Sequence, residues 1–108
     1  MKLIDKYTEL KPLIRNKTIK YGGWTVIKGD KIKKLKGVSI IGGSLRLLDS
    51  AVEDLGNLRI IKKNFWIHQY HFYSPLKSLG KLEEVGGDLR LSNSNVEDLG
   101  KLKKLGKH

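Results

Sequence analysis

Apolar and polar residues recur along most of this chain in a long repeated pattern. The stretch Ile41 to Leu58 and the stretch Val85 to Leu102 share one order of residues: an apolar residue, Gly-Gly, a polar residue, Leu-Arg-Leu, a short polar run, Val-Glu-Asp-Leu-Gly, any residue and Leu. Agreement over so many positions indicates an internal repeat. Repeats with a period of roughly 20 to 50 residues are typical of solenoids and related arrays.

The spacing of glycine pairs defines the coils of this repeat. The pairs begin at Gly22, Gly42 and Gly86, and Lys62-Lys63 takes the same place in the coil between the last two. We therefore predict four coils that start near residues 22, 42, 62 and 86, with a fifth only hinted at by Leu105-Gly106. The third coil is longer than the others, and its extra residues fall in a loop insertion at 68–73.

Each coil contributes apolar residues at matching positions. Two of them alternate with polar residues, which is the period-two mark of a half-buried strand. One coil cannot bury these residues alone, but stacked coils bury them in columns. The predicted fold class is a β-rich α/β solenoid of about four coils of ~20 residues, which form a short parallel sheet. The inward strand positions are Thr25 and Ile27, Leu45 and Leu47, Phe65 and Ile67, and Leu89 and Leu91.

The N-terminal segment does not fit the repeat. Leu3, Tyr7, Leu10 and Ile14 fall at helical spacing, and Pro12 should end or kink such a helix near Leu10. The first coil of a solenoid exposes its apolar cross-section unless something covers it. We therefore expect one domain, 1–108, with an N-terminal helical cap at 1–18 and repeats at 19–106.

The repeat resembles the leucine-rich repeat, in particular its short bacterial form. The resemblance covers roughly residues 20–106 and rests on one pattern: Leu45, Leu47, Ser50, Val52, Leu55, Gly56 and Leu58. The GG-x-L-x-L element also looks like repeats of small proteins of bacteria and their phages. Family members often have Pro where this chain has Gly56, Gly80 and Gly100. In that family the residues between the inward strand positions line a concave face to which partners bind.

By this resemblance, a partner-binding face would display Trp24, Arg46, Trp66 and Arg90. Val26 and Ser44 would lie on the same face. Trp and Arg are over-represented among residues that dominate binding energy. The alternative is that Trp24 and Trp66 pack on the cap or on the long loop.

The insertion is a second candidate binding surface. Loops that project from one coil of a solenoid often carry specificity. The alternative is a loop that folds back over an apolar patch. We expect no metal site, because the two histidines lack a third ligand of suitable spacing. The candidate residues of the loop are His68, Tyr70, His71, Phe72 and Tyr73.

Positive charge is concentrated in the N-terminal third. The net charge is +11, and residues 1–40 hold eleven Lys or Arg against three acids. Such a lopsided basic protein attracts polyanions, although a solvated lysine-rich surface explains the same composition. The candidate polyanion-binding residues are Lys20, Lys28, Lys31, Lys33, Lys34 and Lys36.

Several classes of protein are disfavoured. There is no phosphate loop, dinucleotide fingerprint or nucleophile elbow, and we expect no enzyme, cofactor or small-molecule substrate. Glu53-Asp54 and Glu97-Asp98 occupy equivalent repeat positions, which indicates a structural or solvated role. The chain has no cysteine, no apolar run of membrane-spanning length and no recognisable signal peptide, so we expect a cytoplasmic protein that does not bind a membrane.

Three functions remain in competition. The first is a protein-binding module for an acidic protein partner. The second is nucleic-acid binding through the basic third and the tryptophans. The third is a small phage-type inhibitor of a host defence complex, such as a CRISPR nuclease. A dimer through the uncapped C-terminal coil is a further expectation, unless the lysines there blunt its edge.

Overall fold

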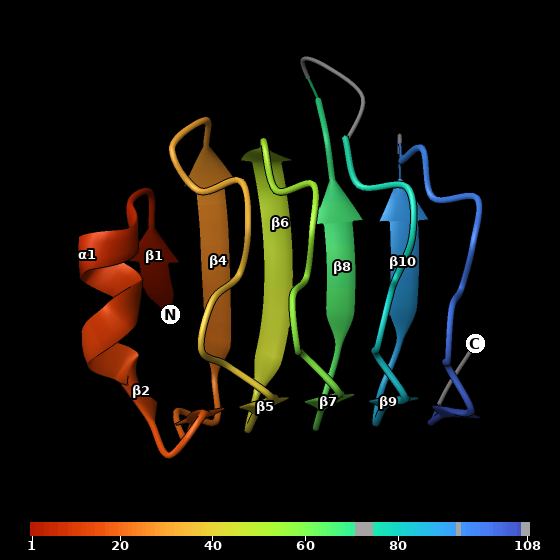
Figure 1. Cartoon of the computed structure of the whole chain (residues 1–108), viewed down its shortest axis with the longest axis horizontal. Coiled ribbons are helices and arrows are strands. Elements are labelled where there is room, and N and C mark those ends of the chain that lie inside the picture. Colours follow the sequence, from red (N-terminus) through yellow and green to blue (C-terminus); the bar gives the residue numbers. More distant parts are fainter. Residues whose placement is uncertain (71–74, 93, 107–108) are drawn as a thin grey trace.

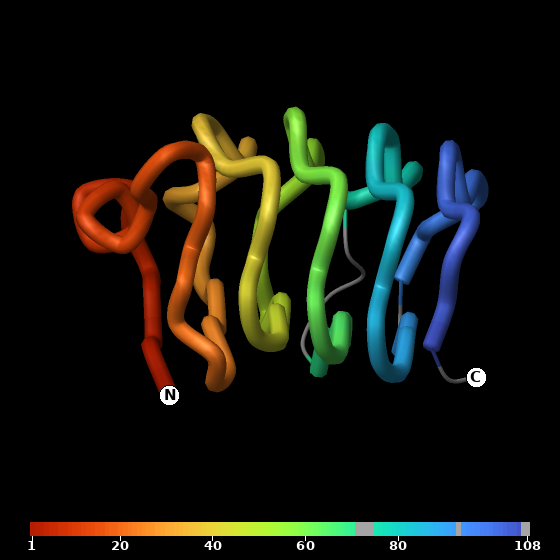
Figure 2. Tube along the Cα trace, turned by 90° about the horizontal axis from the view of Figure 1, so that it is seen from below, coloured from red at the N-terminus to blue at the C-terminus, as the bar shows by residue number. Residues whose placement is uncertain are grey.

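The chain winds into a β-solenoid of about five turns (Figure 1). The structure is a computed structural model, and it describes residues 1–70, 75–92 and 94–106. The turns stack side by side along the long axis, and the two ends of the chain lie at opposite ends of the stack (Figure 2). The β-rich solenoid that the repeat predicts is confirmed, with one turn more than the four predicted coils.

A five-stranded parallel sheet forms one side of the solenoid, with the strand order β1-β4-β6-β8-β10. We call it sheet A. Its members are β1 (Lys2–Ile4), β4 (Trp24–Gly29), β6 (Ser44–Ser50), β8 (Phe65–His68) and β10 (Leu89–Ser92). The register pairs Thr25 with Leu45, Leu45 with Phe65 and Phe65 with Leu89, so the predicted coil spacings are confirmed.

A second sheet of very short strands, which we call sheet B, has the order β11-β9-β7-β5-β3-β2. Successive turns contribute one parallel strand each, and β2 pairs with β3 in antiparallel fashion. The members are β2 (Ile14–Arg15), β3 (Thr18–Ile19), β5 (Ile40–Ile41), β7 (Ile60–Ile61), β9 (Glu84–Val85) and β11 (Lys104–Leu105).

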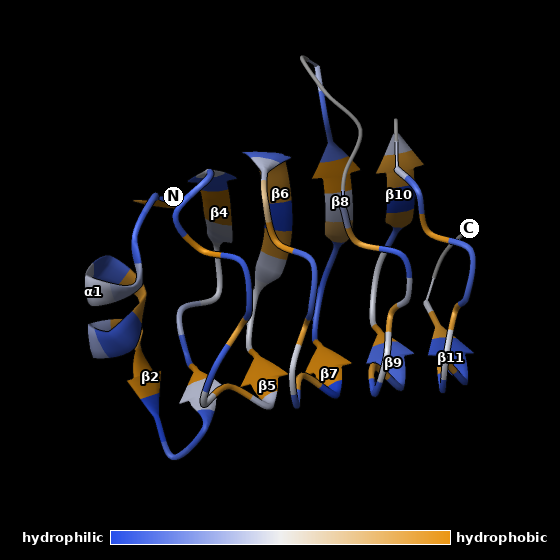
Figure 3. Cartoon of the chain, turned by 45° about the horizontal axis from the view of Figure 1, so that its top comes forward, coloured by the Kyte–Doolittle hydropathy of each residue, from blue (hydrophilic) through white to orange (hydrophobic). Residues whose placement is uncertain are grey.

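The core lies between the two sheets and the connecting segments. Apolar segments recur at matching places in successive turns (Figure 3), and the columns expected from the repeat are buried through the turn that contains Val85. The column of Leu35, Leu55 and Leu79 is at most 2% exposed. Each leucine of the column is covered by the next turn. A single turn of this sequence could therefore not bury its leucines by itself.

The N-terminal segment differs from the helix predicted for residues 1–18. Only Tyr7–Leu10 forms a helical turn (α1), followed by a 3-10 turn at Lys11–Leu13 (η1). Leu3 instead lies in β1, where its side chain is 48% exposed, and Ile14 lies in β2. Pairing of β1 with β4 supplies hydrogen bonds that outweigh the local helical pattern. Ile4 and Leu10 of this segment are nevertheless buried.

The glycines of the repeat serve two different needs. Gly56, Gly80 and Gly100 have φ values of 63°, 57° and 60°, a left-handed conformation that proline cannot adopt. The Gly-Gly pairs do not have positive φ; a side chain at Gly43 or Gly86 would instead collide with the backbone of the preceding turn. The left-handed glycines therefore follow the leucine column and do not lie in the Gly-Gly pairs.

Acidic and hydroxyl side chains hold these left-handed turns. Asp54 Oδ1 and Asp98 Oδ1 accept hydrogen bonds from the backbone N–H groups of Gly56 and Gly100, each at 2.7 Å. Ser78 Oγ accepts the equivalent bond in the turn between them, at 3.0 Å. A side-chain oxygen that bonds the backbone two residues on is a common way to close a turn. The structural role expected for Asp54 and Asp98 is confirmed.

Candidate functional site

Four side chains on the outer side of sheet A form the candidate binding surface. Trp24 lies on β4, Arg46 on β6, Trp66 on β8 and Arg90 on β10. We call these four residues the Trp–Arg face. The register places Arg46, Trp66 and Arg90 directly beside one another, because parallel pairing aligns the same repeat position of successive turns. The structure thus brings together the four residues that the repeat predicted.

Trp66 is the centre of this face. Its ring packs against the ring of Trp24, with the two centroids 4.7 Å apart and the planes inclined by 56°. The guanidinium of Arg90 lies over Trp66, 4.5 Å from the ring centroid, which is the geometry of a cation–π contact. Trp66 is half-buried as a result. Within the described residues, the two tryptophans therefore pack on each other.

Two smaller residues expected on this face are covered. Val26 is 1% exposed and Ser44 is 3% exposed, so a partner could not reach either of them. Ser44 Oγ accepts a hydrogen bond from the backbone N–H of Asn64, and the rings of Trp24 and Trp66 pack against each other on the same sheet. The surface that remains is a shallow hollow of about 170 Å³ lined by Met1, Trp24, Val26, Arg46 and Trp66.

Nitrogen atoms of this face lack hydrogen-bond partners in the described part of the chain. They are Arg46 Nε, Trp66 Nε1 and His68 Nδ1, all of them buried. Arg90 differs, since its guanidinium lies 3.6 Å from a carboxylate oxygen of Asp88. Buried polar atoms are usually paired, so a concentration of unpaired nitrogens is unusual. The guanidinium of Arg46 can donate hydrogen bonds to an acceptor on another molecule.

An aromatic row continues from Trp66 toward the inserted loop. The His68 ring lies 5.3 Å from Trp66, and Tyr70 lies 6.2 Å from His68. Tyr70 is 68% exposed, the most accessible aromatic side chain of the row. His71, Phe72 and Tyr73, which were also expected to bind a partner, lie outside the described residues. His68, the last residue of β8, and Tyr70, which follows the end of β8, therefore extend the Trp–Arg face.

His68 is shifted toward its neutral form. Burial lowers the pKa of its imidazole below the ordinary value of 6.5, and the positive charges of Arg46 and Arg90 lower it further. The unfolded chain thus takes up the proton at higher pH than the folded one. Folding stability should consequently decline as the pH falls through 6.5 toward the lowered pKa, and become constant below it.

A site-resolved NMR titration tests this shift. We expect the His68 resonance to titrate below 6.5 and to move toward that value in Arg46→Gln, which removes one of the two neighbouring charges. Arg59→Gln is the matched control, because Arg59 pairs with Glu83 at 3.2 Å. A His68 pKa that is unchanged in Arg46→Gln would show that this arginine does not act on the imidazole.

The start of the insertion contains a structural residue that the sequence did not reveal. Gln69 is 1% exposed, and its amide forms two hydrogen bonds of 3.0 Å with the backbone N–H and C=O of Ser50. Asp49 Oδ1 accepts a further bond from the N–H of Tyr70. The side chain of Gln69 thus continues the pairing of β6 where β8 ends. No periodic signal marks this residue, because it occurs in only one turn.

The candidate lysines do not form one site. Lys31, Lys33, Lys34 and Lys36 line a hollow of about 300 Å³ beside Tyr7, whereas neither Lys20 nor Lys28 lines it. Lys28 belongs to β4, and Lys20 lies between β3 and β4.

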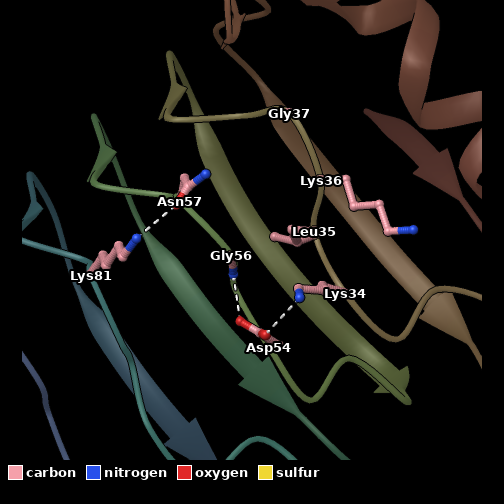
Figure 4. A pocket seen from close by; sticks show the side chains of 8 residues that line it. All are labelled: Lys34, Leu35, Lys36, Gly37, Asp54, Gly56, Asn57 and Lys81. Carbon is pink, nitrogen blue, oxygen red and sulfur yellow. Dashed lines mark hydrogen bonds and ion pairs between the residues drawn. The ribbon is translucent and has the colours of Figure 1, made fainter.

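A neighbouring hollow of about 390 Å³ shows how its lysines are already engaged (Figure 4). Lys34 lies 3.5 Å from Asp54, and Lys81 donates a hydrogen bond to Asn57. The side chain of Lys36 points away from Asp54 and from Asn57 (Figure 4). These ammonium groups do not converge on one point, so the hollow is not arranged around a single anion.

Other types of site have no geometric support in the described residues. No group of three His, Asp or Glu side chains there is placed to hold a metal ion. Among the same residues, no helix has the length and apolar character required to cross a membrane.

Comparison of the chain with protein-family models, curated proteins and solved structures gives no match. The resemblance to leucine-rich repeats therefore remains a prediction, and the candidate site rests on the structure itself.

Proposed function

We propose that this protein is a non-enzymatic binding module that holds an acidic protein partner against the Trp–Arg face. The observation that carries the proposal is the placement of Arg46. Arg46 lines a hollow together with Met1, Trp24, Val26 and Trp66, and it forms no ion pair within the described residues. An acidic side chain with an apolar stem fits such a hollow, with its carboxylate on the arginine.

The state of the aromatic rings favours a protein over a nucleic acid. Proteins that bind single strands present free ring faces on which bases stack. Here Trp24 and Trp66 pack against each other, and Arg90 covers the ring of Trp66. A central aromatic cluster with arginines beside it is instead the composition of protein-binding hot spots.

The charge of the chain supports an acidic partner. A net charge of +11 attracts negative surfaces over a Debye length, and the attraction speeds association. Arg90 is already neutralised in part by Asp88, whereas Arg46 forms no ion pair within the described residues. Arg46 is accordingly the residue that supplies charge recognition, and Trp66 supplies apolar contact.

Capture of a partner by the purified chain tests the proposal. The double variant Trp66→Ala, Arg46→Ala is expected to weaken binding by about 2 kcal/mol or more, roughly 30-fold, because it removes the central ring and the arginine that receives the carboxylate. Binding of the captured partner is measured by titration calorimetry. Arg59→Ala is the control, since it removes an equally long cation that pairs with Glu83.

Two outcomes would contradict the proposal. Full affinity of the double variant would remove the Trp–Arg face from the interface. A gel shift of single-stranded RNA that weakens steeply between about 50 and 200 mM salt, and that the double variant abolishes, would make nucleic acid the ligand.

The narrower prediction of a phage-type inhibitor rests on size, charge and repeat class alone. Identification of the captured partner by mass spectrometry tests it, because an inhibitor of that type must return a protein of a host defence complex.

A further inference from the structure

The last described turn of the solenoid leaves its apolar columns open. Leu99 is 49% exposed, whereas the equivalent Leu35, Leu55 and Leu79 are at most 2% exposed. Leu105 is 38% exposed, although the equivalent Ile41, Ile61 and Val85 are at most 1% exposed. Apolar residues at these two positions are therefore buried in the turns that are followed by another turn. They are exposed to solvent in the last described turn.

The backbone is open at the same place. β10 pairs only with β8, and β11 pairs only with β9, so one edge of each strand has no partner strand in the described part of the chain. An edge of this kind offers a row of N–H and C=O groups to another strand. At the other end of the stack, β1 likewise pairs only with β4, but Ile4 and Leu10 are buried there. The two ends are thus unlike each other.

We infer that this end, comprising β10, β11, Leu99 and Leu105, binds the same end of a second copy of this chain. A two-fold axis perpendicular to sheet A brings β10 against β10 of the second copy in antiparallel orientation. Leu99 and Leu105 belong to the same end of each copy, so association through this end can remove their exposed surface from water. Because both copies use the same surface, the assembly is complete at two subunits and does not grow into a fibre.

The available area agrees with a weak dimer. The two shorter extents of the molecule are 29 and 21 Å, so an end face covers at most about 600 Å² per copy. Two such faces reach about 1,200 Å², the lower limit for specific interfaces. Interfaces of this size lie at the small end of specific complexes.

The distribution of charge favours the C-terminal end of the solenoid over the N-terminal end as the contact between two copies. Residues 84–108 hold five basic and four acidic residues, whereas residues 1–40 carry a balance of +8. Association through the last turn keeps the two strongly basic thirds at the far ends of the dimer. Lys103 does not obstruct the contact, because its ammonium group lies 3.7 Å from Glu83 of the preceding turn. Glu97 and Asp98 can receive the remaining lysines of the second copy.

Sedimentation equilibrium over a range of protein concentrations tests this inference. We expect a species of twice the chain mass to accumulate as the concentration rises. Leu99→Glu with Leu105→Glu should weaken the dimer at least about tenfold, because it buries charge at the centre of the contact. Both side chains are exposed in one copy, so the fold itself should be retained, as circular dichroism can verify.

Leu3→Glu is the matched control. Leu3 is 48% exposed, nearly the same as Leu99, but it lies on β1 at the opposite edge of sheet A. Its replacement should leave the dimer intact. A chain that stays monomeric at all concentrations would overturn the inference, as would a dimer that survives the two glutamates. Assemblies that grow beyond two copies and are broken by Leu3→Glu would show a head-to-tail contact instead.

Discussion

Replacement of Phe65 by alanine is expected to lower the free energy of unfolding by about 3–5 kcal/mol. Phe65 is fully buried at the middle of the stack, and it is the largest of the fully buried side chains. Its strand neighbours Leu45 and Leu89 come from the turns on either side, so the cavity would interrupt contacts between three turns. A domain of this size is stable by about 5–15 kcal/mol, and the loss is a large fraction of that.

Urea denaturation followed by circular dichroism measures this effect. Leu99→Ala is the control, because it also truncates a repeat residue but at a position that is 49% exposed. Its cost should remain below about 1 kcal/mol at concentrations where the chain is monomeric. Equal losses of unfolding free energy in the two variants would contradict a core that is buried at Phe65 and exposed to solvent at the last turn.

Replacement of Gln69 by leucine is expected to cost about 2–5 kcal/mol. The leucine cannot replace the two hydrogen bonds of the amide, and it leaves the backbone N–H and C=O of the buried Ser50 without partners. Each unsatisfied buried group costs about 1–3 kcal/mol. The penalty arises although the new side chain has a similar volume and is more apolar.

The same denaturation experiment tests this second variant. Asn57→Leu removes an amide from an exposed position, where it accepts a hydrogen bond from Lys81, and should change stability by no more than about 0.5 kcal/mol. A Gln69→Leu variant as stable as Asn57→Leu would show that the end of β6 does not depend on this side chain.

The N-terminal segment shows where pattern reasoning reaches its limit. Helical spacing of Leu3, Tyr7 and Leu10 predicted a helix, but only Tyr7–Leu10 is helical and Leu3 lies in a strand. β1 has only three residues, and β2 and β3 have two each. Strands this short are stabilised by pairing with distant residues, here Lys2 with Thr25 and Ile19 with Ile41. Local propensity has little influence against such long-range hydrogen bonds.

The candidate site, too, was predictable from the sequence only in part. The repeat placed Trp24, Arg46, Trp66 and Arg90 on one side of a sheet, because alternation and coil spacing follow directly from residue order. It did not indicate that the two indole rings would pack against each other, or that Val26 and Ser44 would be covered. Those contacts depend on side-chain directions and on the separation of strands.

The period of the glycines and leucines was therefore sufficient to establish a β-rich solenoid, the register of its main sheet and the residues of its buried columns. These features repeat, so each turn provides the same evidence again. The structure alone decided the packing of Trp66, the role of Gln69 and the open state of the last turn. Each of these depends on a contact that occurs once, between residues distant in the chain, and a contact without repetition leaves no pattern in the residue order.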